Sequence, residues 1–290
     1  GNLLTETYPS GRTVSYTYDV AGRFRTAAEG SFKYGDVVAD QDYTAHGAVQ
    51  QMKLGISGTA QRWEVSRFNC RLQQRLAGLG SVAGGTDLFG AIFEYGTQND
   101  CTHQPGDPGN NGSLRRQKIL VNSAAVPRFI QTFAYDAYNR LVTATENRDP
   151  SNGGGLVWTQ TYAYDRWGNR AVTASINLPV SPLTPTSLTQ FDAGTNHLLS
   201  PNTYDAAGNQ TRDALNRTFA YDAEGRLAKV TLPDGTIYRY YYDAHGRRFR
   251  KSLNGTTTSY VYDAFGRLAA EYGPSMPTLG TRYLIADNLG

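Results

Sequence analysis

The 290-residue sequence is poor in cysteine, in charge and in long apolar runs. Its two cysteines, Cys70 and Cys101, are too few for a disulfide framework or a zinc site, although they suffice for one bridge. Charged residues make up only 18%, and a hydrophobic share of 39% argues against disorder. No apolar run approaches ~18 residues, so no membrane insertion is expected within this segment, and no signal-peptide pattern opens it.

Basic residues do not gather into blocks either. The net charge is only +3, and Arg outnumbers Lys by 23 to 5 without any run that would predict a nucleic-acid partner. The histidines at 46, 103, 197 and 245 lack the spacing of a metal site. The glycine-rich stretch 84–90 lacks the Lys-Ser/Thr ending of a phosphate-binding loop. We therefore expect no cofactor and no metal.

Glycine and tyrosine are plentiful, with 31 and 20 copies, and they recur in one phrase. The phrase reads Tyr-Asp, two variable residues and then Gly or Asn, usually followed by Arg and preceded by a second aromatic residue. It occurs seven times, which identifies a repeat protein. The repeat residues are Tyr18, Asp19, Gly22, Arg23, Tyr135, Asp136, Asn139, Arg140, Tyr164, Asp165, Gly168, Tyr204, Asp205, Gly208, Tyr221, Asp222, Gly225, Arg226, Tyr242, Asp243, Gly246, Arg247, Tyr262, Asp263, Gly266 and Arg267.

Each phrase predicts a strand, a tight turn and a returning strand. Aromatic residues two apart point to the same face of a strand. Asp at the first turn position accepts hydrogen bonds from the backbone N–H groups that follow, and Gly at the fourth adopts positive φ without steric cost. Asn139 fits that fourth position because Asn tolerates the left-handed region.

A second kind of turn separates the phrases. Residues 232–236 and 253–256 carry Asp-Gly and Asn-Gly, which are hairpin signals. From residue 222 onward the two kinds of turn alternate about every ten residues. The pattern predicts an all-β fold, an antiparallel strip of β-hairpins with turns on alternate edges.

We expect one continuous array over residues 1–290. It is regular over 1–24, 129–170 and 204–290, and degenerate or inserted over 25–128 and 171–203. The stretches 148–155, 178–187 and 192–202 are rich in Pro, Gly, Ser, Thr or Asn and are expected to be surface loops.

The degenerate part allows more than one interpretation. Residues 43–47 and 67–72 look like altered copies of the phrase, the second of them shortened. Residues 93–96 begin another copy, whose return is delayed to 113–115 by a polar loop. Residues 62–79 fit either the strip or a helix, because Phe68, Leu72, Leu76 and Leu79 have helical spacing.

The repeated Tyr-Asp-x-x-Gly-Arg-Leu phrase resembles the YD repeat of RHS-repeat proteins. That family includes bacterial RHS toxins, the C component of ABC-type toxin complexes, wall-associated repeat proteins and animal teneurins. The resemblance covers nearly the whole chain, and Tyr283 to Gly290 is similar to the segment that closes the array. It implies that the strip winds into a spiral β-solenoid or a segment of a hollow shell.

The resemblance implies a non-catalytic scaffold in the wall of a secreted or cell-surface shell. Its partners would be the rest of the same polypeptide and an enclosed, toxin-like C-terminal cargo. The alternative is an adhesin that binds carbohydrate through exposed Tyr and Arg. The family's self-cleaving site uses paired Asp-Pro-x-Gly sequences, and because Asp107-Pro108-Gly109 has no partner we do not carry that activity over.

The repeat residues also allow chemical interpretations. The Asp residues suit a polysaccharide hydrolase, which needs two carboxyl groups ~5–10 Å apart, but turn capping explains all seven at once. We therefore expect no enzyme and no catalytic residue. The Tyr rows are interpreted as cross-strand packing rather than stacking on sugars. Each repeat Arg is expected to pair with a neighbouring repeat's Asp or to lie over a Tyr face, rather than bind sulfated or phosphorylated glycans.

Overall fold

The computed structural model describes residues 2–29, 32–33, 42–54, 61–96, 110–122, 126–274 and 281–282. In this part of the chain the regular elements are antiparallel β-strands and two short 3-10 helices, η1 (Pro150–Asn152) and η2 (Leu188–Gln190). The chain divides into two compact units. The first comprises Gly1–Thr7, Arg12–Asp165 and Arg170–Val180, and the second comprises Tyr8–Gly11, Arg166–Asn169 and Ser181–Gly290.

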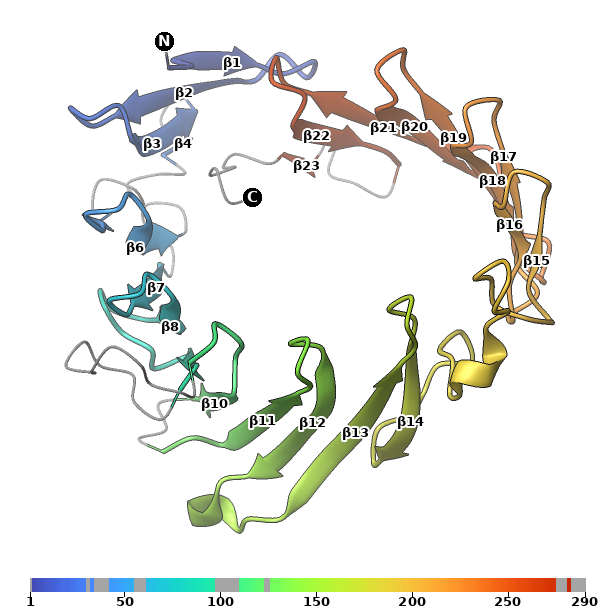
Figure 1. The fold of residues 1–290 in the computed structure, drawn as a ribbon. Helices are drawn as coiled ribbons and strands as arrows, with labels where there is room; N and C mark the ends of the chain where they lie inside the picture. Colours follow the sequence, from blue (N-terminus) through green and yellow to red (C-terminus); the bar gives the residue numbers. More distant parts are fainter. Residues whose placement is uncertain are drawn as a thin grey trace. The chain divides into compact units, whose positions relative to one another are not determined.

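The first unit contains two sheets whose strands pair in chain order (Figure 1). The smaller sheet consists of β1 (Thr5–Thr7), β2 (Thr13–Tyr18), β3 (Phe24–Glu29) and β4 (Phe32–Lys33). The larger consists of β5 (Asp42–Tyr43), β6 (Val49–Leu54), β7 (Arg62–Phe68), β8 (Gln74–Gly80), β9 (Phe89–Glu94), β10 (Arg116–Val121), β11 (Phe129–Tyr135), β12 (Leu141–Arg148), β13 (Leu156–Tyr164) and β14 (Arg170–Ile176).

The second unit contains one sheet, again in chain order (Figure 1). Its strands are β15 (Thr203–Tyr204), β16 (Gln210–Arg212), β17 (Thr218–Tyr221), β18 (Leu227–Thr231), β19 (Ile237–Tyr242), β20 (Arg248–Leu253), β21 (Thr256–Tyr262), β22 (Leu268–Tyr272) and β23 (Thr281–Arg282). Because successive strands are antiparallel neighbours, the turns fall on alternate edges. The all-β strip of hairpins expected from the sequence is confirmed.

The repeat phrase forms a turn with a glycine bulge. Between β2 and β3, Gly22 N donates to Asp19 O at 2.9 Å, and Asp19 N donates to Arg23 O at 2.9 Å. Gly22 has a φ of 77°, and the strand register shifts by one residue between Thr17 and Tyr18. This is the three-residue hairpin loop in which a left-handed residue makes a β-bulge.

The strip has two chemically different faces. In β2 the residues Val14, Tyr16 and Tyr18 alternate with Thr13 and Thr17. The two sets therefore lie on opposite faces of the strand. Hydroxyl pairs cross the strands on that second face, as between Thr7 and Thr13 at 2.9 Å. The sequence pattern accordingly gives one aromatic face and one hydroxyl face.

Burial is shallow because each sheet is a single layer. Among the described residues, the largest side chains that are no more than 2% exposed are Val14, Val65 and Asp213. Neighbouring strands rather than one central core therefore hold the strip together, as in other repeat proteins.

The structure decides the open points in the degenerate part. Residues 62–79 form β7 and β8 rather than a helix, and residues 44–48 and 69–73 make turns of the repeat type. The copy at 67–72 is not shortened, because Asn69 takes the place of Asp and Leu72 adopts the left-handed conformation with a φ of 62°. Cys70 is exposed, whereas Cys101, Asp107 and residues 283–290 lie outside the described residues.

Candidate functional site

In most repeat turns the first and last residues form an ion pair. In the turn of residues 222–226, Asp222 Oδ1 accepts from the backbone N–H groups of Glu224 and Arg226 at 3.0 and 2.9 Å. Its Oδ2 accepts from Arg226 Nε at 2.7 Å. The same pairing joins Asp19 to Arg23, Asp136 to Arg140, Asp243 to Arg247 and Asp263 to Arg267. Both carboxylate oxygens are thus engaged within the turn.

Most of the repeat Tyr side chains attach their hairpin to the one before it. Tyr242 Oη donates to the carbonyl oxygen of Leu227 at 2.9 Å, and Tyr164 Oη donates to that of Leu141 at 2.8 Å. Each acceptor lies at or next to the start of the preceding return strand. The remaining bonds of this kind run from Tyr18 to Leu3, Tyr43 to Phe24, Tyr95 to Gln74, Tyr135 to Leu114, Tyr221 to Gln210 and Tyr262 to Arg248.

The repeat Arg adds a second contact to the same Tyr side chain. The guanidinium of Arg226 lies 5.1 Å from the centre of the Tyr242 ring, and that of Arg140 lies 4.7 Å from the Tyr164 ring. Arg23 over Tyr43 and Arg247 over Tyr262 repeat the contact. Of the two alternatives expected for the repeat Arg, these four side chains take the position over a Tyr face. Their ion pairs are with the Asp of their own turn rather than with that of a neighbouring repeat.

We call this arrangement of Asp, Arg and the following Tyr the repeat clamp. Its hydrogen bonds hold the carboxyl groups in the charged form. The backbone N–H of Arg226 has the largest effect in lowering the pKa of Asp222, and that of Arg140 does so for Asp136. Burial opposes this effect at Asp263, yet hydrogen bonds from Arg267 bring its pKa below the usual value as well. A carboxylate whose pKa is lowered is not poised to act as a general acid at neutral pH.

Some repeats lack the Arg and so have an incomplete clamp. Asn209 stands at this position before Tyr221, Gln73 before Tyr95 and Ser113 before Tyr135. Asn209 Nδ2 still donates to Asp205 Oδ2 at 3.1 Å. Tyr204 instead stacks against His197, with ring centres 4.0 Å apart.

Replacing Asn209 with Arg is expected to raise the melting temperature by about 1–2 °C, because the guanidinium would reach the Tyr221 ring and keep the bond to Asp205. Thermal unfolding followed by circular dichroism measures the change. Asn209→Gln is the matched control, since it lengthens the side chain without adding charge. Equal melting temperatures for the two variants would contradict a contribution from the cation–aromatic contact.

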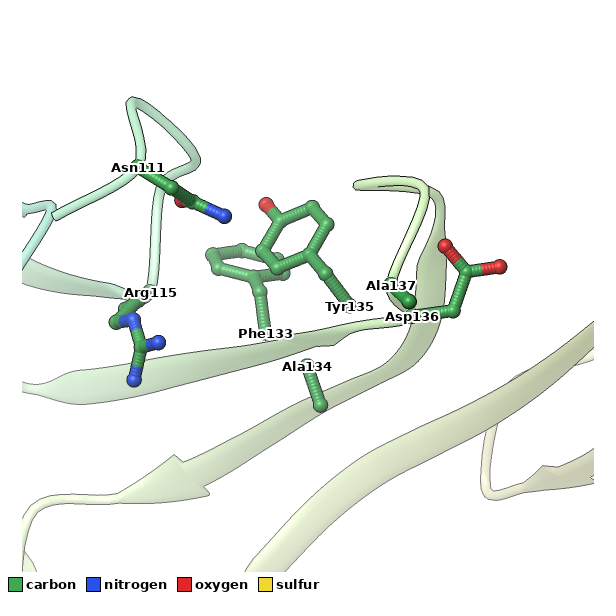
Figure 2. A pocket seen from close by; sticks show the side chains of 7 residues that line it. All are labelled: Asn111, Arg115, Phe133, Ala134, Tyr135, Asp136 and Ala137. Atoms are coloured by element: carbon green, nitrogen blue, oxygen red, sulfur yellow. The ribbon is translucent and has the colours of Figure 1, made fainter. Parts of the chain in front are cut away.

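The incomplete clamp before Tyr135 opens a cavity of about 420 Å³ (Figure 2). The rings of Phe133 and Tyr135 lie on the same side of β11 as Asn111, whereas Arg115 points away from both rings. Ser113 is too short to cover Tyr135 as Arg140 covers Tyr164. The cavity is therefore a consequence of the delayed return strand.

Sequence reasoning missed one turn of the repeat type, at residues 213–217. Asp213 Oδ1 accepts from the N–H groups of Leu215 and Arg217 at 3.0 Å each, and Asn216 takes the left-handed position with a φ of 58°. Asp213 Oδ2 accepts from Arg217 Nε at 2.5 Å. The absence of a Tyr before Asp213 hid the turn, although the spacing from Asp to Arg was a usable signal.

The described ranges contain no candidate metal centre. None of them contains a group of three or more His, Cys, Asp or Glu side chains that would hold a metal ion. Neither of the short 3-10 helices described is long or apolar enough to cross a membrane.

Comparison with known proteins places these features in context. The family model described as RHS Repeat matches residues 1–31 and 221–251. The tRNA nuclease WapA of Bacillus subtilis strain 168 is 32% identical over 131 residues, which are 44% of this chain and 5% of the relative. The tRNA3(Ser)-specific nuclease WapA of Bacillus spizizenii is 31% identical over 131 residues, again 44% of this chain and 5% of the relative. The chain thus spans only a small part of these relatives.

Solved structures share the fold. The Tc holotoxin pore of Photorhabdus luminescens, with a TccC3 variant, matches 93% of this chain and 14% of its own at a TM-score of 0.61 and 19% identity. The TcdB2–TccC3 complex matches 93% of this chain and 15% of its own at a TM-score of 0.61 and 18% identity. A likeness at this identity concerns the fold alone, and a spiral β-solenoid is consistent with it.

Proposed function

We propose that this chain, which is an RHS/YD-repeat protein and a scaffold of hairpins, forms part of the wall of a shell that encloses a C-terminal polypeptide. Its partners are then the rest of the same polypeptide and the enclosed cargo, and the assembly is secreted or displayed at the cell surface. The observation that carries the proposal is the single-layer strip whose hairpins are joined by repeat clamps.

A wall needs lateral strength without a thick core. The clamp supplies this where it is complete, because the hairpin is then joined to the next by a hydroxyl–carbonyl hydrogen bond and a cation–aromatic contact as well as by the strand ladder. Such nearest-neighbour contacts allow a sheet to extend without burying both of its faces in one core. One face therefore remains available to shelter a polypeptide.

The state of the repeat carboxylates supports a non-catalytic role. Asp222 Oδ1 accepts two backbone N–H groups while Oδ2 accepts from Arg226, so the side chain is committed to its turn. A hydrolase would instead need one carboxyl with a raised pKa facing another across a cleft. The pKa of Asp222 is lowered.

The same engagement counts against the adhesin alternative in the form that uses the repeat Tyr and Arg. Tyr242 and Tyr262 use their hydroxyl groups for backbone carbonyls and present a ring face to an Arg. A sugar stacking there would have to displace both interactions. We therefore favour the shell.

Intact mass spectrometry of the full-length product, expressed from the complete reading frame, tests the proposal. We expect two pieces that co-purify, with the cut downstream of this segment. The smaller piece should resist trypsin until denaturant opens the wall. As the control, the same C-terminal piece is expressed alone and digested in parallel. A single uncut chain whose C-terminal region is digested as fast as the free piece would contradict the proposal.

A further inference from the structure

A second cavity, also of about 420 Å³, lies at the edge of the first unit opposite the repeat turns of β11–β12 and β13–β14. Val121, Arg128, Phe129, Arg148 and Asn152 line it. These residues come from the end of β10, the start of β11, the end of β12 and the loop that contains η1. None of the lining residues is acidic, and none belongs to a repeat clamp.

Two arginines and one phenyl ring are among the residues that line this cavity. Phe129 stands directly opposite Arg148 in the β11–β12 register, so the two side chains share a face. Arg128 folds its guanidinium over the same ring, 5.7 Å from its centre. Both arginines are exposed, and the structure gives neither an ion pair with a described residue. The clamp arginines, in contrast, each pair with an Asp.

The loop beside the cavity is held in place by its own hydrogen bonds. Asp149 caps η1 by accepting from Ser151 N at 2.9 Å, and Asp149 N donates to Arg128 O at 3.1 Å. Asn152 Nδ2 donates to Pro127 O at 2.7 Å. Glu146 is the acidic residue nearest to Arg148 on the same face of the β11–β12 pair. Its carboxylate accepts a hydrogen bond from Gln131 Nε2 at 2.7 Å. The loop beside the cavity is thus fixed, and one oxygen of each neighbouring carboxylate, Asp149 and Glu146, already accepts a hydrogen bond.

We propose that this cavity is a binding site for a tetrahedral oxyanion, a phosphate or sulfate group held between Arg128 and Arg148. Guanidinium forks match such groups with two parallel N–H···O bonds, and an adjacent ring shields them from water. The group is either a free anion or an ester carried by a polymer. The site is separate from the proposed wall function and does not depend on it.

Isothermal titration calorimetry with inorganic phosphate, at constant ionic strength in NaCl, tests the site. We expect saturable 1:1 binding that weakens at least fivefold in Arg128→Gln and in Arg148→Gln. The matched control is Arg75→Gln on β8, an exposed arginine for which the structure likewise gives no ion pair, and its affinity should change less than twofold. Thermal melts verify that all three variants fold.

A heparin-derived sulfated tetrasaccharide identifies the source of the anion. If it binds more tightly than phosphate and loses affinity in the same two variants, the group is carried by a polymer. Weaker binding than phosphate identifies a free anion. The absence of saturable phosphate binding, or an equal loss in Arg75→Gln, would overturn the proposal.

Discussion

Alanine in place of Asp213 is expected to lower the free energy of unfolding by about 2–3 kcal/mol, because the carboxylate is almost fully buried and accepts the hydrogen bonds that close its turn. Asp213 is only 2% exposed and accepts from two backbone N–H groups and from Arg217. Its removal leaves the two N–H groups without their acceptor and the Arg217 charge without its partner. The partial exposure of Arg217 keeps the cost below that of a fully buried ion pair.

Urea unfolding at pH 7, followed by tryptophan fluorescence, measures the loss. Asp213→Asn is the control, since its amide oxygen still caps the turn as Asn69 does between β7 and β8. It should lose less than half as much. Equal losses for the two variants would show that the charge, rather than the cap, carries the effect and would contradict this account.

The stabilisation that Asp213 contributes to the folded state also depends on pH. Burial raises its pKa, but the hydrogen bonds from Arg217 and the backbone outweigh this, so the folded pKa lies below the ordinary value. The stabilisation is therefore present above the unfolded pKa of ~3.9 and disappears as pH falls through the lower folded value. The difference between the wild type and Asp213→Ala should shrink accordingly in acid.

The sequence was sufficient to predict the strip because its turn chemistry is local. Asp at the first position and Gly at the fourth determine a hairpin over five residues, and no distant contact can override them cheaply. The same reasoning extended to Asn139, which adopts a φ of 60°. That the array is one continuous domain over residues 1–290 stays a prediction.

The partner of the repeat Arg was not predictable from position along a strand. The glycine bulge brings the fifth turn residue back beside the first, so Arg226 Nε reaches its own Asp222. The remaining length of the side chain then extends over Tyr242 of the following hairpin. An Arg at the start of a straight strand would not make both contacts, so this double use could not be predicted from the sequence.

The two cavities were also beyond sequence reasoning. The one beside Tyr135 exists because a clamp residue is missing where the return strand is delayed. The one beside Phe129 depends on which side chains the β11–β12 register places opposite each other. The cavity beside Phe129 involves no repeat motif, so only the pairing of strands reveals it.

Alanine at Gly80 is expected to cost about 2–3 kcal/mol in the free energy of unfolding, because the backbone leaves no room for a Cβ there. A Cβ at this position would lie 2.4 Å from the carbonyl oxygen of Gly85 and 2.5 Å from its carbonyl carbon. The obstacle is main chain rather than a movable side chain. The turn from β8 to β9 is held by Ser81 N donating to Asp87 Oδ1 at 2.9 Å, so it cannot shift without loss of that bond.

Gly90→Ala is the matched control, since the nearest atoms to its added Cβ are the Leu120 Cδ1 and Thr86 Cβ side-chain atoms at 3.4 Å. Urea unfolding should show a loss below about 1 kcal/mol for this variant. Equal losses would contradict the close-contact account. A larger loss for Gly80 would show that the main chain at Gly85 packs directly against the end of β8, which leaves room only for glycine at position 80.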